Sequence, residues 1–198
     1  MNLPNLLTWM RIALIPIFVG VFYLPDGVLG AHLSNLYAAL IFGLAALTDW
    51  FDGYLARRLQ QASAFGAFLD PVADKLMVVA ALIVLVDLGR AHVYVALIII
   101  GREIAISALR EWMAHIGHQH SVAVSFIGKL KTTAQMIAII LLLYHDPVPF
   151  FEPVQTLGRW LLDIAALLTL WSMAHYLHAA WQSLRNQPVA VSTKKHGD

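Results

Sequence analysis

Six apolar stretches alternate with short polar segments along the chain. They cover residues 6–24, 36–57, 68–88, 93–112, 122–144 and 157–180. Each stretch is near the ~20 residues that an α-helix needs to cross the hydrocarbon core of a bilayer. Helices satisfy their own backbone hydrogen bonds, so they can span lipid without an edge that needs a partner. The pattern therefore predicts an all-α integral membrane protein with six transmembrane helices.

The composition supports a single membrane unit. Of the 198 residues, 60% are hydrophobic and 13% are charged, with a mean hydropathy of +0.70, which is too apolar for an ordinary soluble domain. We expect one catalytic membrane domain over residues 1–185 and a short polar tail over residues 186–198. The absence of cysteine excludes disulfides and thiol chemistry. The net charge of +1, without a long basic run, gives no indication of nucleic-acid binding.

The distribution of cationic residues predicts the orientation of the helices. An even number of helices places both termini on one side of the membrane. That side would carry Arg57, Arg58, Arg185, Lys194 and Lys195, against Arg90 and Arg159 on the other side. Because cytoplasmic flanks are enriched in Lys and Arg, we expect both termini in the cytoplasm. Most polar groups within the apolar stretches then fall in the cytoplasmic half.

Four aspartates lie unusually close together for a membrane protein. Asp49 and Asp52 are three residues apart, and Asp70 and Asp74 are four apart, so each pair lies on one face of its helix. Carboxylates at low dielectric raise one another's pKa unless cations are bound. Oxygen ligands favour Mg²⁺ or Mn²⁺, and four carboxylates suffice for two ions flanking a phosphate.

Two other interpretations of the aspartates remain open from the residues alone. The carboxylates could pair with the neighbouring cations Arg57, Arg58 and Lys75, although ionisable residues in membrane helices usually serve a function. The chain could instead be a divalent-cation transporter whose aspartates line an ion path. A transporter would need polar groups in both halves of the membrane, whereas the outer half is nearly bare of them.

The aspartate segment resembles the signature of the CDP-alcohol phosphotransferase family at every defined position. The matching pattern is Asp49-x2-Asp52-Gly53-x2-Ala56-Arg57-x8-Gly66-x3-Asp70-x3-Asp74. Three further segments are similar to the family members that use glycerol 3-phosphate as acceptor: PNLLTWMRI near the N-terminus, GREIAISALREWMA from Gly101, and GKLKTTAQM from Gly128. The resemblance covers most of the chain.

The resemblance implies a six-helix enzyme of the CDP-alcohol phosphotransferase fold, usually a homodimer, in the bacterial inner membrane with its active site facing the cytoplasm. It would transfer the phosphatidyl group of CDP-diacylglycerol to sn-glycerol 3-phosphate and release CMP. By position, the metal ligands would be Asp49, Asp52, Asp70 and Asp74, with Asp74 also the general base. The CDP-diacylglycerol contacts would be Asn5, Thr8, Gly53, Arg57, Ser63 and Gly66.

Four cations farther along the chain indicate a binding site for an anion. These are Arg102, Arg110, Lys129 and Lys131. Local pairing with Glu103 and Glu111 is one possibility, for Arg102 above all, since deep charges often pair within a bundle. We favour a pocket for the phosphate of glycerol 3-phosphate. These residues alone leave inositol phosphate open as acceptor; the resemblance of residues 101–136 argues against it, and against phosphatidylglycerol in a cardiolipin-forming enzyme.

A histidine cluster follows the fourth apolar stretch. His115, His118 and His120 could suggest zinc, but no nearby carboxylate or cysteine completes a tetrahedral set. We assign no role to this cluster.

Overall fold

The computed structural model describes residues 3–25, 27–59, 64–115, 126–147 and 154–185. Within these ranges the side chains of residues 3–5, 7, 49–59, 64–68, 70–71, 114, 126–130, 179 and 183–184 are not described. The predicted polar tail at residues 186–198, His118 and His120 lie outside the described residues.

Six α-helices and one 3₁₀ turn account for most of the described chain, and no strand occurs in it. They are α1 (Leu3–Gly20), η1 (Val21–Tyr23), α2 (Ala31–Leu59), α3 (Ala64–Asp87), α4 (Val93–His115), α5 (Phe126–Tyr144) and α6 (Val154–Arg185). The prediction of an all-α chain with six long helices is confirmed within these ranges. The largest differences are at the start of α2, which begins five residues earlier than its apolar stretch, and at the end of α6, which extends five residues beyond its stretch.

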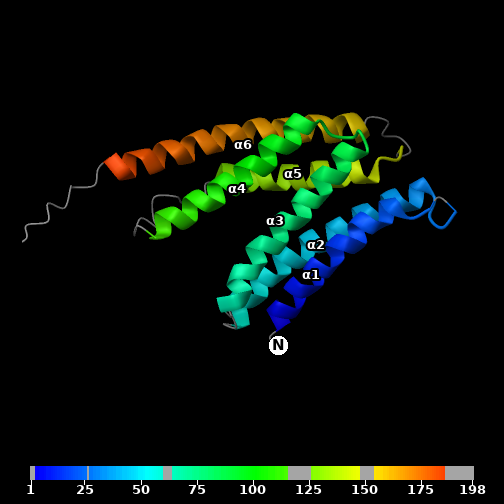
Figure 1. Cartoon of the computed structure of the whole chain (residues 1–198), viewed down its shortest axis with the longest axis horizontal. Helices are drawn as coiled ribbons and strands as arrows, with labels where there is room; N and C mark the ends of the chain where they lie inside the picture. The colour runs from blue at the N-terminus through cyan, green and yellow to red at the C-terminus, as the bar shows by residue number, and fades with distance from the viewer. Residues whose placement is uncertain (1–2, 26, 60–63, 116–125, 148–153, 186–198) are drawn as a thin grey trace, which may run out of the picture.

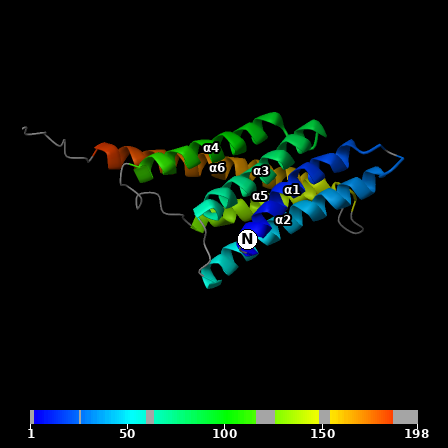
Figure 2. The same cartoon turned by 60° about the horizontal axis from the view of Figure 1, so that its bottom comes forward.

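Successive helices run in opposite directions, as Figures 1 and 2 show. The first residues of α1, α3 and α5 lie toward the same end of the molecule as the last residues of α2, α4 and α6. We call this end the inner end and the opposite end the outer end. The inner end carries the segments that the sequence analysis assigned to the active site.

Small residues allow the helices to pack closely. Buried alanines lie in the core of α2, α3 and α5, including Ala38, Ala81 and Ala138. At Gly158 in α6, an added Cβ atom would lie only 3.0 Å from Cγ of Leu142 in α5. Close approach through small residues is the usual means of association between helices in lipid, where burial of apolar surface gives little driving force.

Large apolar side chains cover much of the outer surface of the bundle. Exposed examples on four helices are Leu40, Leu44, Leu97, Ile104, Ile137, Leu167 and Trp171. So much exposed apolar surface is unfavourable in water and is typical of a protein that contacts lipid.

Within the described ranges, two helices are long and apolar enough on their own to cross a membrane. They span Ala31–Thr48 and Val154–Gln182, and shorter apolar segments span Thr8–Tyr23 and Lys131–Tyr144. Helices α3 and α4 carry charged residues within their apolar runs, among them Asp74, Lys75, Arg102 and Glu103. These charged residues lower the hydropathy of the two helices, and they also belong to the candidate site described below.

Arg90 joins three parts of the fold at the outer end. Its guanidinium donates to the carbonyl oxygens of Leu142 and Leu143 in the last turn of α5, at 3.2 and 2.9 Å, and to Oδ1 of Asn35 in α2 at 2.7 Å. Asn35 in turn donates to Asp146 at 3.3 Å. The last carbonyls of a helix have no partner within the helix, so Arg90 satisfies groups that would otherwise be left unpaired.

His145 follows α5 with a left-handed φ of 53°. Gln155 of α6 donates to its carbonyl oxygen at 2.7 Å. Burial lowers the pKa of His145, and the charge of Arg90 lowers it further. The imidazole is therefore neutral at pH 7 and adds no second cation beside Arg90.

Replacing Arg90 should destabilise the bundle without removing any predicted site residue. We expect Arg90→Ala to lower the free energy of unfolding by about 1–3 kcal/mol, because two helix-end carbonyls and Asn35 lose a charged donor. The unfolding transition of the purified protein in detergent measures the change. Arg185→Ala, at the exposed end of α6, is the control. Equal unfolding midpoints for the two variants would contradict the assigned role.

Candidate active site

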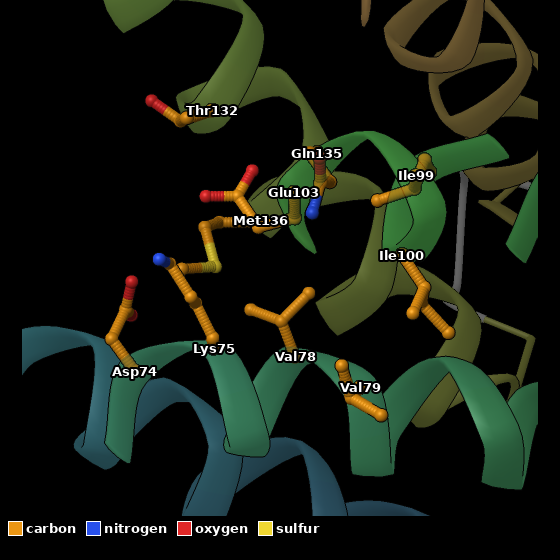
Figure 3. A pocket seen from close by; sticks show the side chains of 10 residues that line it. All are labelled: Asp74, Lys75, Val78, Val79, Ile99, Ile100, Glu103, Thr132, Gln135 and Met136. Atoms are coloured by element: carbon orange, nitrogen blue, oxygen red, sulfur yellow. The ribbon is translucent and has the colours of Figure 1, made fainter. Parts of the chain in front are cut away.

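A cavity of about 60 Å³ lies between α3, α4 and α5. Its polar lining consists of Asp74 and Lys75 from α3, Glu103 from α4, and Thr132 and Gln135 from α5. Figure 3 shows the side chains of Asp74, Lys75 and Glu103 directed toward the same space, with aliphatic residues closing the other side. The predicted base thus lies in a cavity that also holds a cation and a second carboxylate.

Asp74 borders a second, smaller space of about 10 Å³. Arg11 of α1 and Met77 of α3 are among the residues that line it. The Arg11 side chain is only 1% exposed, and a buried guanidinium is costly unless a carboxylate or other acceptors lie close by. The sequence analysis did not include Arg11 in the site, although an arginine within an apolar stretch is itself a sign of function.

Lys75 belongs to the same cavity and contacts α4. Its ammonium group donates to Oγ of Ser107, and Ser107 donates to the carbonyl oxygen of Glu103 at 2.7 Å. Lys75 thus has a hydroxyl partner on another helix, in addition to any charge interaction with the aspartates that the sequence analysis left open.

The backbone brings the four predicted metal ligands to matching heights on two adjacent helices. In α2, Asp52 and Asp49 lie seven and ten residues before the helix end; in α3, Asp70 and Asp74 lie six and ten residues after the helix start. At about 1.5 Å per residue, an antiparallel pair places them in two layers, roughly 10 and 15 Å from the facing ends of the two helices. Helices α2 and α3 contact one another. This all-carboxylate set fits a hard divalent cation, and the side chains of Asp49, Asp52 and Asp70 lie outside the described part of the structure.

The predicted CDP-diacylglycerol contacts cluster at the inner end. Thr8 is fully buried on α1, one turn before Arg11. The structure describes only the backbone of Asn5, Gly53, Arg57 and Gly66. Ser63 lies outside the described residues.

Arg102 is the best-connected member of the predicted cationic set. Its side chain is 8% exposed, and its guanidinium pairs with Oε2 of Glu103 at 2.9 Å. It also donates to Oγ of Ser172 in α6 at 3.4 Å. The local pair that the sequence left open is therefore present, and α6 contributes to the site as well.

Lys131 of α5 brings a second buried cation to this region. It is 2% exposed, and the charges that act on it are those of Arg102, Glu103 and Arg110. Among these described charges, three cations thus accompany the carboxylate of Glu103, which also lines the cavity that contains Asp74. The side chain of Lys129 is not described.

Tyr176 of α6 contacts both arginines. Its ring centroid lies 5.8 Å from Cζ of Arg102 and 5.4 Å from Cζ of Arg110. Its hydroxyl accepts a hydrogen bond from Nη2 of Arg110 at 3.5 Å. The sequence analysis missed Tyr176 and Ser172, because a serine or tyrosine in an apolar helix gives no signal that separates a site residue from packing or an interfacial belt.

The chain is similar to known proteins over most of its length. Residues 1–171 match the family model described as CDP-alcohol phosphatidyltransferase. A protein from Pectobacterium atrosepticum named CDP-diacylglycerol–glycerol-3-phosphate 3-phosphatidyltransferase is 53% identical over 185 residues, which is 92% of this chain and 97% of that protein. Proteins of the same name from Escherichia coli (strain K12) and Shigella flexneri are each 52% identical over 188 residues, 94% of this chain and 98% of theirs.

Proposed function

Because the chain belongs to the CDP-alcohol phosphatidyltransferase family, we propose that it transfers the phosphatidyl group of CDP-diacylglycerol to sn-glycerol 3-phosphate and releases CMP. The observation that carries this proposal is the cavity that contains Asp74 and shares Glu103 with a cluster of cations, of which Arg102 and Lys131 are buried. One site thus offers a base for a hydroxyl group beside cations for a phosphate. The names of the relatives state the same reaction.

Asp74 serves as the general base in this proposal. A hydroxyl group of glycerol 3-phosphate attacks the phosphorus that carries the diacylglycerol, and a new O–P bond forms. The P–O bond of the pyrophosphate breaks, and CMP leaves with the electron pair. The Asp74 carboxylate takes the hydroxyl proton, which requires only that the acceptor hydroxyl lie within hydrogen-bond distance of it.

The four aspartates would hold two Mg²⁺ or Mn²⁺ ions. Bound ions would neutralise the charge of the pyrophosphate oxygens. Residues Asn5, Thr8, Gly53, Arg57, Ser63 and Gly66 would contact the donor. At Gly53 the absence of a side chain would let the nucleotide or phosphate approach the helix backbone, and the planar guanidinium of Arg57 would bind phosphate oxygens.

The cationic cluster favours an acceptor that carries a phosphate. Among the described charges that act on Lys131, Arg102 and Arg110 together with Lys131 itself exceed Glu103 by two charges, and a phosphate dianion would balance this excess. An alcohol such as serine would leave this excess uncompensated. The names of the relatives support glycerol 3-phosphate over inositol phosphate or phosphatidylglycerol, and family membership argues against the transporter interpretation.

The helix arrangement supports the predicted topology. All six helices would cross the bacterial inner membrane, with both termini and the inner end of the bundle at the cytoplasmic face. The acyl chains of the donor would then remain in the bilayer while its CDP group enters between the helices. We retain the homodimer as the expected assembly.

Release of CMP by the purified protein tests the reaction. With CDP-diacylglycerol and Mg²⁺, we expect release that requires glycerol 3-phosphate and stops when EDTA is added. Inositol phosphate, phosphatidylglycerol and serine, offered in parallel, should give none. Release with one of these acceptors alone would contradict the proposed acceptor, and no release from folded protein would contradict the proposed reaction.

Replacement of Asp74 tests the base. We expect Asp74→Asn to lower kcat by at least about 10³-fold, because the amide cannot take the proton and ligates metal weakly. Asp87→Asn on the same helix, at its exposed outer end, is the matched control and should retain wild-type turnover. Size-exclusion chromatography establishes that both variants are folded. Near-wild-type turnover of Asp74→Asn would exclude this residue as the base.

Replacement of the cluster cations tests the acceptor site. Arg110→Ala or Lys131→Ala should raise the KM for glycerol 3-phosphate roughly 10- to 100-fold, as expected for a lost charged hydrogen bond. The KM for CDP-diacylglycerol should change much less. Arg159→Ala, an exposed cation near the outer end of α6, serves as the control. Equal increases in both KM values would argue against a separate acceptor pocket.

A further inference from the structure

Helix α6 lies along α4 in both views of the molecule (Figures 1 and 2), and the two helices are in contact. Tyr176 is the α6 residue at which the two arginines of α4 converge, with Cζ atoms 5.8 Å (Arg102) and 5.4 Å (Arg110) from its ring centroid. Arg102 and Arg110 are eight residues apart, or about 12 Å along the helix axis. A single aromatic ring therefore links two cations that their own helix would keep apart.

The ring offsets part of the cost of gathering like charges. The face of an aromatic ring carries negative charge density, which attracts a guanidinium group within about 6 Å. Glu103 is paired with Arg102 alone among the described arginines. For Arg110, the described contacts are the ring and the hydroxyl of Tyr176.

The two arginines differ in how many contacts other than the Tyr176 ring hold their side chains in place. Arg102 is 8% exposed and is held by Glu103 and Ser172 as well. Arg110 is exposed, and a long exposed side chain loses considerable rotamer entropy when it binds a ligand. By restricting Arg110 beforehand, Tyr176 reduces that loss.

The cluster retains unused capacity to donate hydrogen bonds. Nε of Arg102 is buried and has no hydrogen-bond partner among the described residues. Buried donors of this kind are rare in proteins and usually have a functional explanation. Arg102 is thus not fully satisfied by the described residues, as expected of a site that binds an anion.

From this geometry we propose that Tyr176 is a positioning residue for the acceptor: it holds Arg102 and Arg110 at the spacing that binds the phosphate of glycerol 3-phosphate. The inference rests on the proposed function and extends it to α6. Tyr176 lies beyond residue 171, where the match to the family model ends. Neither the family match nor the sequence motifs assign it a role.

Two substitutions separate the ring from the hydroxyl group. Tyr176→Phe keeps the ring, and Tyr176→Leu removes it. Isothermal titration calorimetry of the purified full-length protein in detergent measures the affinity for sn-glycerol 3-phosphate. We expect the affinity of Tyr176→Phe to be within about threefold of wild type, because the lost hydrogen bond is long. Tyr176→Leu should bind roughly 5- to 30-fold more weakly, the loss expected for two cation–π contacts.

A second tyrosine provides the matched control. Tyr94 lies on α4 itself, near the outer end, with its ring stacked on His92 at 5.2 Å. Tyr94→Leu removes a ring of the same size and should leave the affinity for glycerol 3-phosphate unchanged. Thermal unfolding of all variants separates local loss of affinity from loss of fold.

Kinetics distinguish positioning from a general structural role. Tyr176→Leu should raise the KM for glycerol 3-phosphate by a similar factor and leave the KM for CDP-diacylglycerol within about twofold, whereas a misfolded site would change both. Wild-type affinity in Tyr176→Leu, equal losses in the Phe and Leu variants, or no binding by the wild-type protein would each overturn the inference. Wild-type protein that binds glycerol 3-phosphate but releases no CMP would contradict the proposed function alone.

Discussion

Charged side chains buried among apolar helices are the constraint on which this structure depends. Arg11, Arg102 and Lys131 are each at most 8% exposed, and an isolated charge is very costly to bury at low dielectric. In lipid, burial of apolar surface provides little free energy that would favour one neighbouring helix over another. Arg102 of α4 donates to Ser172 of α6, and Lys131 of α5 lies among charges of α4, so the buried cations help to decide which helices lie side by side.

The two ends of the bundle use polar groups in different ways. At the outer end, Arg90 donates to two carbonyl oxygens of α5 and to Asn35, so its hydrogen bonds are used within the protein. In the inner cluster of Arg102, Arg110, Lys131 and Glu103, Nε–H of Arg102 is buried without a partner in the described structure, and the three cations outnumber the one carboxylate among the described charges that act on Lys131. The outer cluster stabilises the fold, whereas the inner cluster has the excess charge of a binding site.

Glu103 connects the two halves of the proposed site. It lines the cavity of Asp74 and pairs with Arg102, so it reduces the repulsion among the cations when no phosphate is bound. Binding of a phosphate would replace part of this neutralisation and place the acceptor beside Asp74. Proximity of a base and an anion site supplies much of what a transfer reaction needs, because orientation alone removes a large part of the barrier.

The sequence by itself determined the six helices, their order and the positions of the aspartates, because apolar run length and helical spacing are local properties of the chain. It also named the cations Arg102, Arg110 and Lys131. Only the tertiary structure decided that Arg102 pairs with Glu103, that Arg11 lies beside Asp74, and that α6 supplies Ser172 and Tyr176. Apart from the local Arg102–Glu103 pair, these contacts join residues far apart in the chain. Neither hydrophobic periodicity nor motif spacing specifies which helix faces pack together.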